Sequence, residues 1–271
     1  MVRRKTVKME SDNRTKSFYR NSFLAVILSI VSIYSCEAPD DRSAAERIIE
    51  KSIEVSGGEN YSKAEIEFYF RNRKYTSKRD GGLFRLERVV TDSMGNRTHD
   101  ILSNEGLERM ENDRPVTVPD SMVTRISDGV NSVHYFVQVP YVLNTKAAKK
   151  KLVGEDEIFG ETYFEVKITF GEEGGGTDHH DEFLYWIHRK NYTVDYFAYR
   201  FYTNDGGIRF RKAVNPRTIE GIRFVDYKNY KIEDLSIPLA ELDSLYETGA
   251  LKLLSNIRND SIKVKLDKNN Q

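Results

Sequence analysis

Cysteine is almost absent from this sequence. Cys36 is the one cysteine in 271 residues, so no disulfide can form within the chain. Small secreted domains that lack a sufficient core depend on such cross-links. We therefore expect a fold that is held together by packing alone.

The sequence has little in the way of long hydrophobic runs. The apolar stretch FLAVILSIVSI, residues 23–33, is too short for a membrane-spanning helix, which needs about 20 apolar residues. Seven basic and two acidic residues precede it. A basic segment followed by a short apolar segment is typical of a secretory signal peptide. Residues 1–35 are therefore predicted to be a signal peptide that starts at Met1 or Met9.

The lone cysteine follows this segment directly. The sequence Ile-Tyr-Ser-Cys at residues 33–36 resembles a bacterial lipobox, although Tyr34 stands where a small residue is usual. The resemblance implies that Cys36 is acylated, with palmitate for example, and becomes the N-terminus after cleavage. Several acyl chains together anchor a protein stably in a membrane. The alternative is a plain signal peptide or N-terminal anchor with an incidental cysteine.

Acidic residues come next in the chain, with Glu37, Asp40 and Asp41 close together. They resemble the acidic tag that sends some Gram-negative lipoproteins to the cell surface, and acidic linkers are also common. The predicted location is the bacterial cell envelope, as an outer-membrane lipoprotein facing the periplasm or the surface. Residues 36–42 are then a tether.

An excess of basic charge is also lacking. The formal net charge of the whole chain is +0, and removal of residues 1–35 leaves about −5. Proteins that bind nucleic acid carry a basic patch or stripe, so no nucleic acid partner is predicted.

Aromatic residues, in contrast, are abundant, with 16 Tyr and 14 Phe against only 6 Pro. This composition favours a large antiparallel sheet. Residues 43–257 are predicted to form one mainly β domain, and residues 258–271 a polar tail.

The order of hydrophobic patterns predicts the elements of this domain. Ser43 and Glu46 form a capping box for a helix that ends at Gly57. Alternating strands follow at residues 64–70, 82–89, 97–103, 106–112 and 114–118. We expect the first two to pair as a hairpin.

The second half begins with a helix, from about residue 127 to Pro140, with Val130, Val133, His134 and Val137 facing inward. Residues 145–154 are predicted to be a short basic helix or turn. Five strands joined by short turns follow between residues 162 and 232, and residues 238–257 are predicted to form a closing helix. Strands in sequence order predict an up-and-down antiparallel sheet.

This order of elements resembles the half-open β-barrels of outer-membrane lipoprotein carriers with the LolA/LolB-like fold. Four segments, NSVHYFVQVPYVLN, VGEDEIFGETYFEVKITFGEEGGG, DEFLYWIHRKNYTVDYFAY and RFRKAVNPRTIEGIRFVDYKNY, look like an uncharacterised family of Gram-negative lipoproteins with that fold. The resemblance covers roughly residues 44–235. It implies a curved antiparallel sheet wrapped around a few helices, and it implies no activity or catalytic residue.

A curved sheet with one uncovered face leaves an apolar wall that can hold a lipid or another hydrophobic small molecule. The residues predicted to form this wall are inward-pointing aromatics: Phe68, Phe70, Phe84, Phe164, Tyr185, Tyr196, Phe210 and Phe224. The alternative is that these side chains simply fill the core.

Chemistry-bearing motifs are sparse. Asp178, His179, His180 and Asp181 stand side by side, and their side chains suit zinc or similar ions. Neighbours on a strand point to opposite faces, so Asp178 with His180, or His179 with Asp181, share a side. A metal would then need a third ligand, and the bland alternative is a polar hairpin edge.

No Gly-x-Ser-x-Gly motif occurs. Lys167 in VKITFG resembles the Schiff-base lysine strand of deoxyribose-phosphate aldolases. That family needs eight strand-helix units, and the alternation puts Lys167 with Glu165 and Thr169 on a polar face. The aldolase interpretation is therefore disfavoured.

Three hypotheses remain for function. The favoured one is a non-enzymatic, membrane-anchored lipoprotein that binds a lipid or other hydrophobic ligand in a half-open barrel. The second is a structural or partner-binding lipoprotein with a filled cavity, and the third is an envelope enzyme with an Asp/His site at residues 178–181. No cofactor is predicted, and the oligomeric state is left open.

Overall fold

The computed structural model describes residues 42–80, 82–171, 180–203 and 206–267. The chain divides into two units, residues 1–42 and residues 43–271, and the fold described here is that of the second unit. The signal peptide, Cys36 and most of the acidic tether lie outside the described residues. In the described part, no helix is long and apolar enough to cross a membrane.

Helix α2, Ala44–Ser56, opens the domain as predicted. The Ser43 hydroxyl accepts a hydrogen bond from the Glu46 amide at 3.2 Å, and the Glu46 carboxylate accepts one from the Ser43 amide at 2.7 Å. These two bonds satisfy amide donors that a helix start leaves free. Gly57 ends the helix at φ +141°, and a Cβ there would lie 3.1 Å from the Ile222 backbone. Glycine is thus required by both conformation and space.

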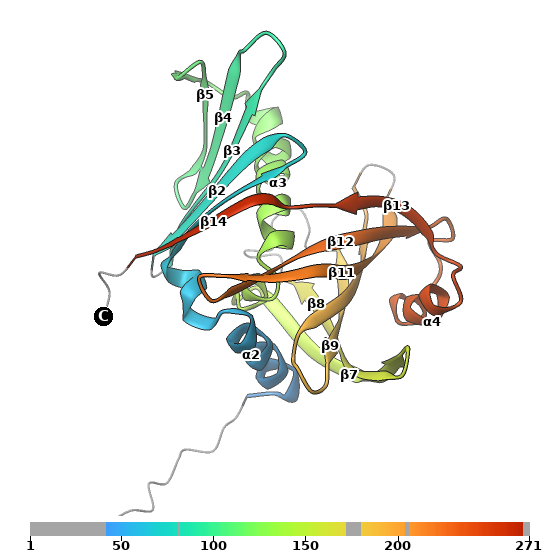
Figure 1. The fold of residues 1–271 in the computed structure, drawn as a ribbon. Coiled ribbons are helices and arrows are strands. Elements are labelled where there is room, and N and C mark those ends of the chain that lie inside the picture. Colours follow the sequence, from blue (N-terminus) through green and yellow to red (C-terminus); the bar gives the residue numbers. More distant parts are fainter. Residues whose placement is uncertain (1–41, 81, 172–179, 204–205, 268–271) are drawn as a thin grey trace, which may run out of the picture. The chain divides into compact units, whose positions relative to one another are not determined.

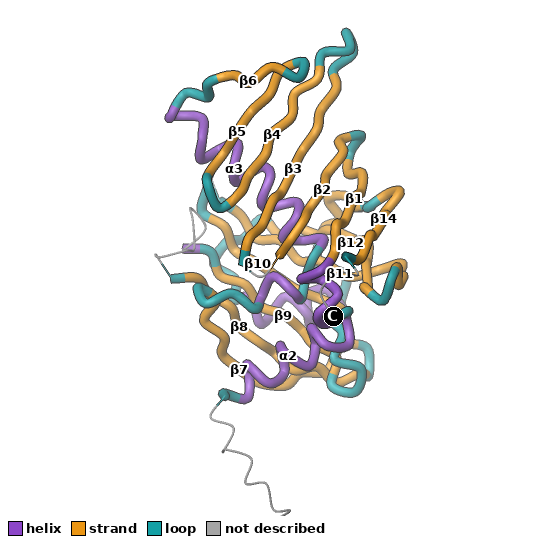
Figure 2. The backbone as a smooth tube through the Cα atoms, turned by 90° about the vertical axis from the view of Figure 1, so that its left-hand side faces the viewer, coloured by secondary structure: helices purple, strands orange, loops and turns teal. Residues whose placement is uncertain are grey.

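The first half of the domain, joined by the C-terminal strand β14, forms a seven-stranded antiparallel sheet, called sheet A, in the order β14-β1-β2-β3-β4-β5-β6. Its strands lie side by side in Figure 2. Their bounds are β1 Ala64–Phe70, β2 Arg73–Asp80, β3 Leu83–Thr91, β4 Arg97–Ser103, β5 Gly106–Glu111, β6 Arg114–Val116 and β14 Asp260–Leu266. The expected hairpin of residues 64–70 with 82–89 is wrong, because β2 lies between these strands and pairs with both.

The second half forms sheet B, also antiparallel, in the order β13-β12-β11-β10-β9-β8-β7. Its bounds are β7 Ala148–Ile158, β8 Glu161–Phe170, β9 Glu182–His188, β10 Val194–Phe201, β11 Gly207–Ile219, β12 Ile222–Ile232 and β13 Lys252–Ile257. Within the described residues, each sheet runs from one edge strand to another and neither closes on itself. The predicted mainly β class, with open antiparallel sheets and few helices, is confirmed, with two sheets in place of one.

Helix α3, Asp120–Val137, lies against β3 and β4 of sheet A, as Figure 1 shows. It begins about seven residues earlier than predicted. Its inward positions are close to those expected: Val130, His134 and Val137 are buried, and Val133 is half-buried. The imidazole of His134 packs edge-on against Phe68, and burial lowers its pKa to about 4.

Residues 145–154 do not form the expected basic helix or turn. Most of this stretch belongs to β7, whose side chains alternate between exposed and less exposed, with Lys149 and Lys151 outward. β7 is an edge strand, and lysines on an edge discourage pairing with another chain. The lysine run is therefore the outer side of a strand.

The C-terminal predictions are also wrong. The expected closing helix is reduced to the 3-10 turn η5, Leu239–Glu241, and the short helix α4, Leu242–Glu247. β13 follows and pairs with β12, and β14 takes up most of the predicted polar tail and pairs with β1. Each of these strands covers an edge that would otherwise present unpaired backbone groups.

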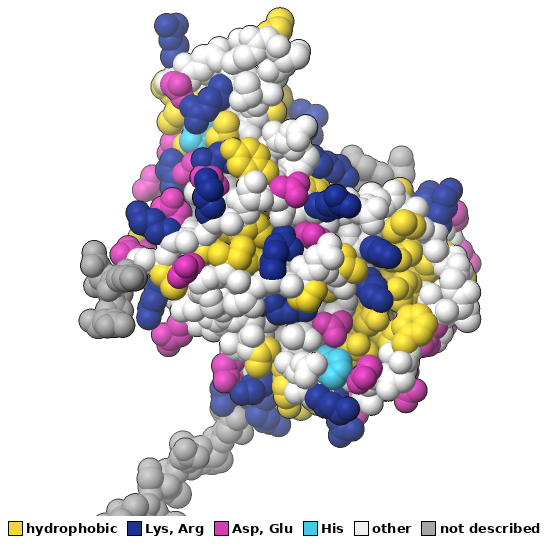
Figure 3. Space-filling model, in the orientation of Figure 1, with side chains coloured by type: hydrophobic (Ala, Val, Ile, Leu, Met, Phe, Trp, Pro, Cys, Tyr) yellow, Lys and Arg dark blue, Asp and Glu magenta, His cyan; other side chains and the backbone are white. Residues whose placement is uncertain are grey.

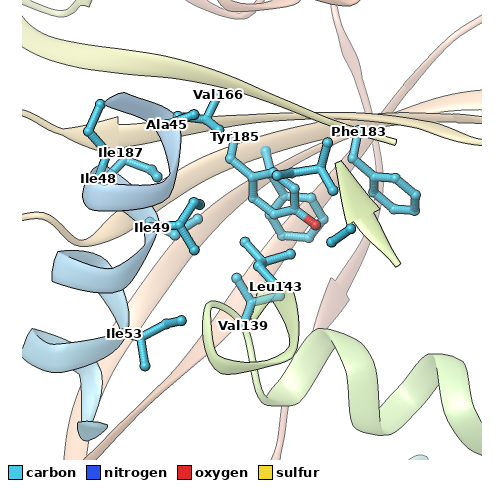
Figure 4. Close-up of a cluster of buried hydrophobic side chains, with 14 of the residues drawn as sticks. Ala45, Ile48, Ile49, Ile53, Val139, Leu143, Val166, Phe183, Tyr185 and Ile187 are labelled. Atoms are coloured by element: carbon cyan, nitrogen blue, oxygen red, sulfur yellow. The ribbon is translucent and has the colours of Figure 1, made fainter. Parts of the chain in front are cut away.

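The buried side chains form clusters on both faces of sheet B and on one face of sheet A. The largest joins α2 and the turn η3, Tyr141–Leu143, to sheet B, and Figure 4 shows Ile49, Leu143 and Tyr185 meeting there. A second cluster lies on the opposite face of sheet B, beneath η5 and α4. The third joins sheet A and the 3-10 helix η2, Gly58–Lys63, to β12. Both faces of sheet B are thus covered.

Candidate functional site

A cavity of about 780 Å³ lies among sheet A, sheet B and helix α3. Strands β1 to β3 line it from sheet A and strands β8 to β13 from sheet B, together with the second half of α3 and residues 141–145. Cavities of about 300–1,000 Å³ are the usual size of small-ligand sites. Both halves of the chain therefore contribute to one site.

Aromatic rings make up much of the cavity wall, and six of them are Tyr135, Phe136, Phe183, Tyr199, Phe201 and Tyr227. The rings contact one another: the centroids of Phe136 and Tyr199 lie 5.3 Å apart, and those of Tyr135 and Phe183 lie 5.8 Å apart. Rings held by neighbouring rings present a rigid apolar surface. This wall suits the hydrophobic part of a ligand.

Of the described residues that line the cavity, four are arginines, Arg71, Arg79, Arg209 and Arg211, and one, Asp181, is acidic. The cavity is thus more positive than the surface, where basic and acidic side chains are interspersed on the face shown in Figure 3. A cavity lined by one sign of charge with low-dielectric walls concentrates the electric field. The charge of this wall favours an anionic group.

Arg211, on β11, is the most enclosed of the four, at 7% exposed. Its guanidinium carbon lies 3.8 Å from the centre of the Phe136 ring, and its Nη2 donates a hydrogen bond to the Tyr199 hydroxyl at 2.9 Å. Its Nε is buried with no hydrogen-bond partner among the described residues. Aromatic faces stabilise a cation, but they do not neutralise its charge.

Arg79 approaches from sheet A. Its Nε donates to the Gln138 side-chain oxygen at 3.2 Å, and Gln138 in turn donates to the Ser77 hydroxyl at 3.0 Å. Burial lowers the pKa of the Arg79 guanidinium, although arginine keeps its charge in proteins. This arginine is held by neutral groups.

An acidic cluster lies on the other face of sheet B. Asp156, Glu165 and Asp243 each place one carboxylate oxygen within 4.8 Å of the other two. Glu165 and Asp243 are buried. Burial raises the pKa of Glu165 to about 7, and repulsion from Asp243 and Asp156 adds to the shift. Burial likewise raises the pKa of Asp243 to about 6, with a contact to Asp156 adding to it. The cluster therefore takes up protons near neutral pH.

The sequence matches the model of one protein family. That family is described as a family of unknown function, DUF6503, and the match spans residues 20–259. The chain belongs to this family. The prediction of an uncharacterised family is thereby confirmed. No curated protein matches the sequence.

Solved structures similar to this DUF6503 chain have low sequence identity to it. A LolA superfamily protein from Nitrosomonas europaea has 12% identity and a TM-score of 0.47, covering 84% of this chain and 95% of its own. A DUF1329 family protein from Desulfovibrio piger has 11% identity and a TM-score of 0.42, covering 85% and 96%. A domain from Vibrio parahaemolyticus that is described as an outer membrane lipoprotein-sorting protein domain has 6% identity and a TM-score of 0.36, covering 83% of this chain and 94% of its own.

The aromatic residues predicted as cavity wall are distributed over several places in the DUF6503 fold. Phe70 and Phe84 line the cavity. Phe68 and Phe224 lie in the core cluster of sheet A, whereas Tyr185 and, at its margin, Phe164 belong to the cluster around α2. Tyr196 and Phe210 face the opposite side of sheet B.

The placement of Tyr196 and Phe210 away from the cavity has a physical reason. A register shift between Val194 and Tyr196 changes the phase of β10, so Phe197 and Tyr199 face the cavity side and Tyr196 does not. On β11, Phe210 points to the second core, which turns Arg209 and Arg211 toward the cavity. Alternation alone would place Arg209 and Arg211 on a solvent-facing side of the sheet. The sequence does carry one sign against this: the neighbouring strand β10 has large apolar residues at both odd and even positions, so both of its faces are covered.

The predicted metal ligands are not brought together with other ligands in the described structure. Asp178 lies outside the described residues, and His180 is exposed. Among the described residues, the group of side chains that could share an ion is Asp156, Glu165 and Asp243. Lys167, the residue of the disfavoured aldolase interpretation, donates a hydrogen bond to Glu182 at 2.6 Å and is 41% exposed, which is not the desolvated setting that a Schiff-base lysine needs.

Proposed function

We propose that this DUF6503 protein is a non-enzymatic lipoprotein of the bacterial cell envelope that holds a lipid or another hydrophobic ligand in the cavity between its sheets. The observation that carries the proposal is the aromatic-lined cavity of about 780 Å³. Its volume lies in the range of small-ligand sites, and such sites are lined mainly by hydrophobic and aromatic side chains with a few polar groups. The wall described above is rich in aromatic rings and also carries charged and polar side chains, so it offers an apolar and a polar surface to one ligand.

The membrane anchor in this proposal is Cys36. The support for it is the sequence alone: a basic segment, a short apolar run and the lone cysteine in that order. Acylation of Cys36 would hold the domain at the outer membrane through the tether of residues 37–42. The anchor and the cavity are separate parts of the proposal and are tested separately.

Cavity binding is tested with protein purified from a bacterial host without detergent. Native mass spectrometry, followed by organic extraction, is expected to find a bound lipid or isoprenoid at one per chain. A clean apo mass together with no uptake on lipid titration would contradict ligand binding and leave the partner-binding hypothesis in front.

A cavity-filling variant sharpens this test. Ser132 lines the cavity on α3, so Ser132→Trp is expected to lower the bound fraction by tenfold or more. Thr124 lies on the same helix but is exposed and outside the cavity lining, so Thr124→Trp is the matched control and should bind as the wild type does. Equal loss in both variants would mean that the helix, and not the cavity, has been disturbed.

The anchor is tested in the full chain. Wild-type protein expressed in bacteria is expected to sediment with membranes and to yield an acylated N-terminal peptide beginning at Cys36. Cys36→Ser should remove both the acylation and the sedimentation while leaving the cavity domain folded. An unmodified Cys36 in the wild-type protein would exclude the lipid anchor.

A further inference from the structure

Among the residues that the structure describes, the arginines of the cavity have no acidic partner. No carboxylate oxygen of the described residues is recorded within 4.0 Å of the side-chain nitrogens of Arg71, Arg79, Arg209 or Arg211. Elsewhere in the same fold the pattern differs: Arg88 pairs with Asp100 at 2.7 Å, and Arg217 pairs with Asp226 at 3.1 Å. The largely buried Arg88 is thus paired with a carboxylate, whereas the buried Arg211 has none beside it in the described part of the chain.

Burial makes this absence costly at Arg211. A buried charge is tolerated when it is paired and hydrogen-bonded, and removal of one partner from a buried pair typically costs several kcal/mol. Arg211 is 7% exposed, and one of its five N–H donors reaches Tyr199. Its Nε reaches no acceptor in the described part of the chain. The missing element is an acceptor with negative charge.

The second arginine of this strand faces the same way. Arg209 is two residues from Arg211, so both side chains leave β11 on the cavity side. The guanidinium carbon of Arg209 lies 5.0 Å from the centre of the Phe201 ring, and its Nη1 donates to the carbonyl of Ile208 at 2.9 Å. Two guanidinium groups on one strand face, each beside an aromatic ring, match a carboxylate or a phosphate group with apolar surroundings.

We infer that the ligand of the cavity is an anionic amphiphile, whose single acid group, a carboxylate or a phosphate ester, binds Arg211 with Arg209 beside it while its hydrocarbon part lies against the aromatic wall. The inference rests on the proposed function, because it names the ligand class of the same cavity. A free inorganic anion would leave the aromatic wall unused, and a neutral lipid would leave Arg211 without a partner.

A matched pair of fluorescent probes tests this inference in the full mature chain. 11-(Dansylamino)undecanoic acid carries the acid group, and its methyl ester has the same hydrocarbon and dansyl parts without the charge. The wild-type protein is expected to bind the acid at least tenfold more tightly than the ester. Dansyl emission, titrated below the micelle concentration of each probe, measures both dissociation constants.

Substitution of Arg211 then separates charge from shape. Arg211→Met keeps an unbranched stem beside Phe136, and it is expected to weaken acid binding at least tenfold while ester binding changes less than twofold. Arg73 on β2 is exposed and outside the cavity lining, so Arg73→Gln is the control and should keep the preference for the acid. If Arg211→Met fails to fold, as judged by circular dichroism, Arg209→Gln is expected to weaken acid binding several-fold and to spare the ester.

The outcomes distinguish the two proposals. Equal affinity of the wild type for acid and ester, or equal loss of both in Arg211→Met, would overturn the anionic ligand while keeping a hydrophobic cavity. Binding of neither probe would count against the proposed function itself. Displacement of the acid probe by 10 mM inorganic phosphate would show a free-anion site and overturn the amphiphile.

Discussion

The hydroxyl oxygens of Tyr135 and Tyr185 lie 2.8 Å apart and join helix α3 to strand β9. Tyr185 is fully buried, and burial raises the pKa of its hydroxyl well above the usual value. A buried hydroxyl without a partner is unfavourable. The helix that lines the cavity is therefore tied to sheet B through a neutral hydrogen bond.

The hydrogen bond between Tyr135 and Tyr185 predicts that the stability effects of replacing the two residues are not additive. Tyr135→Phe leaves the Tyr185 hydroxyl buried and unpaired, so it is expected to lower the free energy of unfolding by about 1–3 kcal/mol. Addition of Tyr185→Phe removes the unpaired hydroxyl, so the double variant should be more stable than Tyr135→Phe alone. Denaturant unfolding of the three variants and the wild type measures these effects, and simple additivity of the two single costs would contradict the prediction.

Asp100 is expected to be essential to sheet A. Its side chain is fully buried and accepts hydrogen bonds from Arg88 at 2.7 Å and from Arg109 at 2.6 Å. Asp100→Ala leaves two largely buried guanidinium groups without a carboxylate, and it should cost about 3–5 kcal/mol of unfolding free energy. Asp113→Ala, which breaks the exposed pair with Arg97, is the control and should cost less than about 1 kcal/mol. Equal effects in a thermal melt would contradict the ranking.

The acidic cluster of Asp156, Glu165 and Asp243, on the face of sheet B opposite the cavity, predicts a pH-dependent stability. The pKa of Glu165 is about 7 in the folded protein, above about 4.3 in an unfolded chain. The folded state therefore binds the proton more tightly, and the stabilisation that this gives is complete below about pH 4 and is lost as the pH rises through 7. Glu165→Gln should unfold with a flatter pH dependence and be about 1–3 kcal/mol more stable than the wild type at pH 8.

The matched control for this variant is Glu157→Gln, at an exposed position of β7. It should leave the pH profile between 4 and 8 unchanged. Chemical denaturation at several pH values gives both profiles. A Glu165→Gln variant whose stability falls with the wild type above pH 6 would show that this carboxyl does not carry the effect.

The C-terminal strand gives the last prediction. A chain that ends at Arg258 lacks β14, so β1 keeps β2 but loses its partner on the other side and becomes an exposed edge of sheet A. We expect loss of soluble protein or a fall of at least 10 °C in melting temperature. Removal of residues 268–271 alone is the control and should change neither. A truncated protein with an unchanged melting temperature would show that β14 is dispensable.

The local elements of this fold follow from local sequence. The capping box at Ser43 and Glu46 and the stop at Gly57 are set within a few residues, and they were predicted correctly. Most alternating strands of both halves are also predicted, because their turns contain residues that favour positive φ or tight bends. Such signals need no knowledge of what lies opposite in space. The strands that are missed are β2, β7, β13 and β14.

The wrong predictions arise where residues distant in the sequence determine the local structure. Lys149 and Lys151 are outward because Ala148 and Leu152, on the other face of β7, pack in the cluster around α2. β13 and β14 are strands because distant edges need partners. Arg209 and Arg211 face inward because α4 and its core take Phe210 on the other side. Sheet B is covered on both faces, so alternation of polar and apolar residues cannot tell which face is the cavity.

The passage between the two sheets near Asn259 has a consequence for biosynthesis. Here the chain leaves sheet B after β13 and enters sheet A as β14, and Asn259 is fixed by hydrogen bonds to Asp226, Val225 and Arg217. Ile257 and Asn259 also line the cavity. The wall is therefore completed by a segment near the C-terminal end of the described residues, so a chain still being synthesised lacks part of its cavity wall. If the cavity holds a ligand as proposed, the complete binding site forms only after this segment has folded.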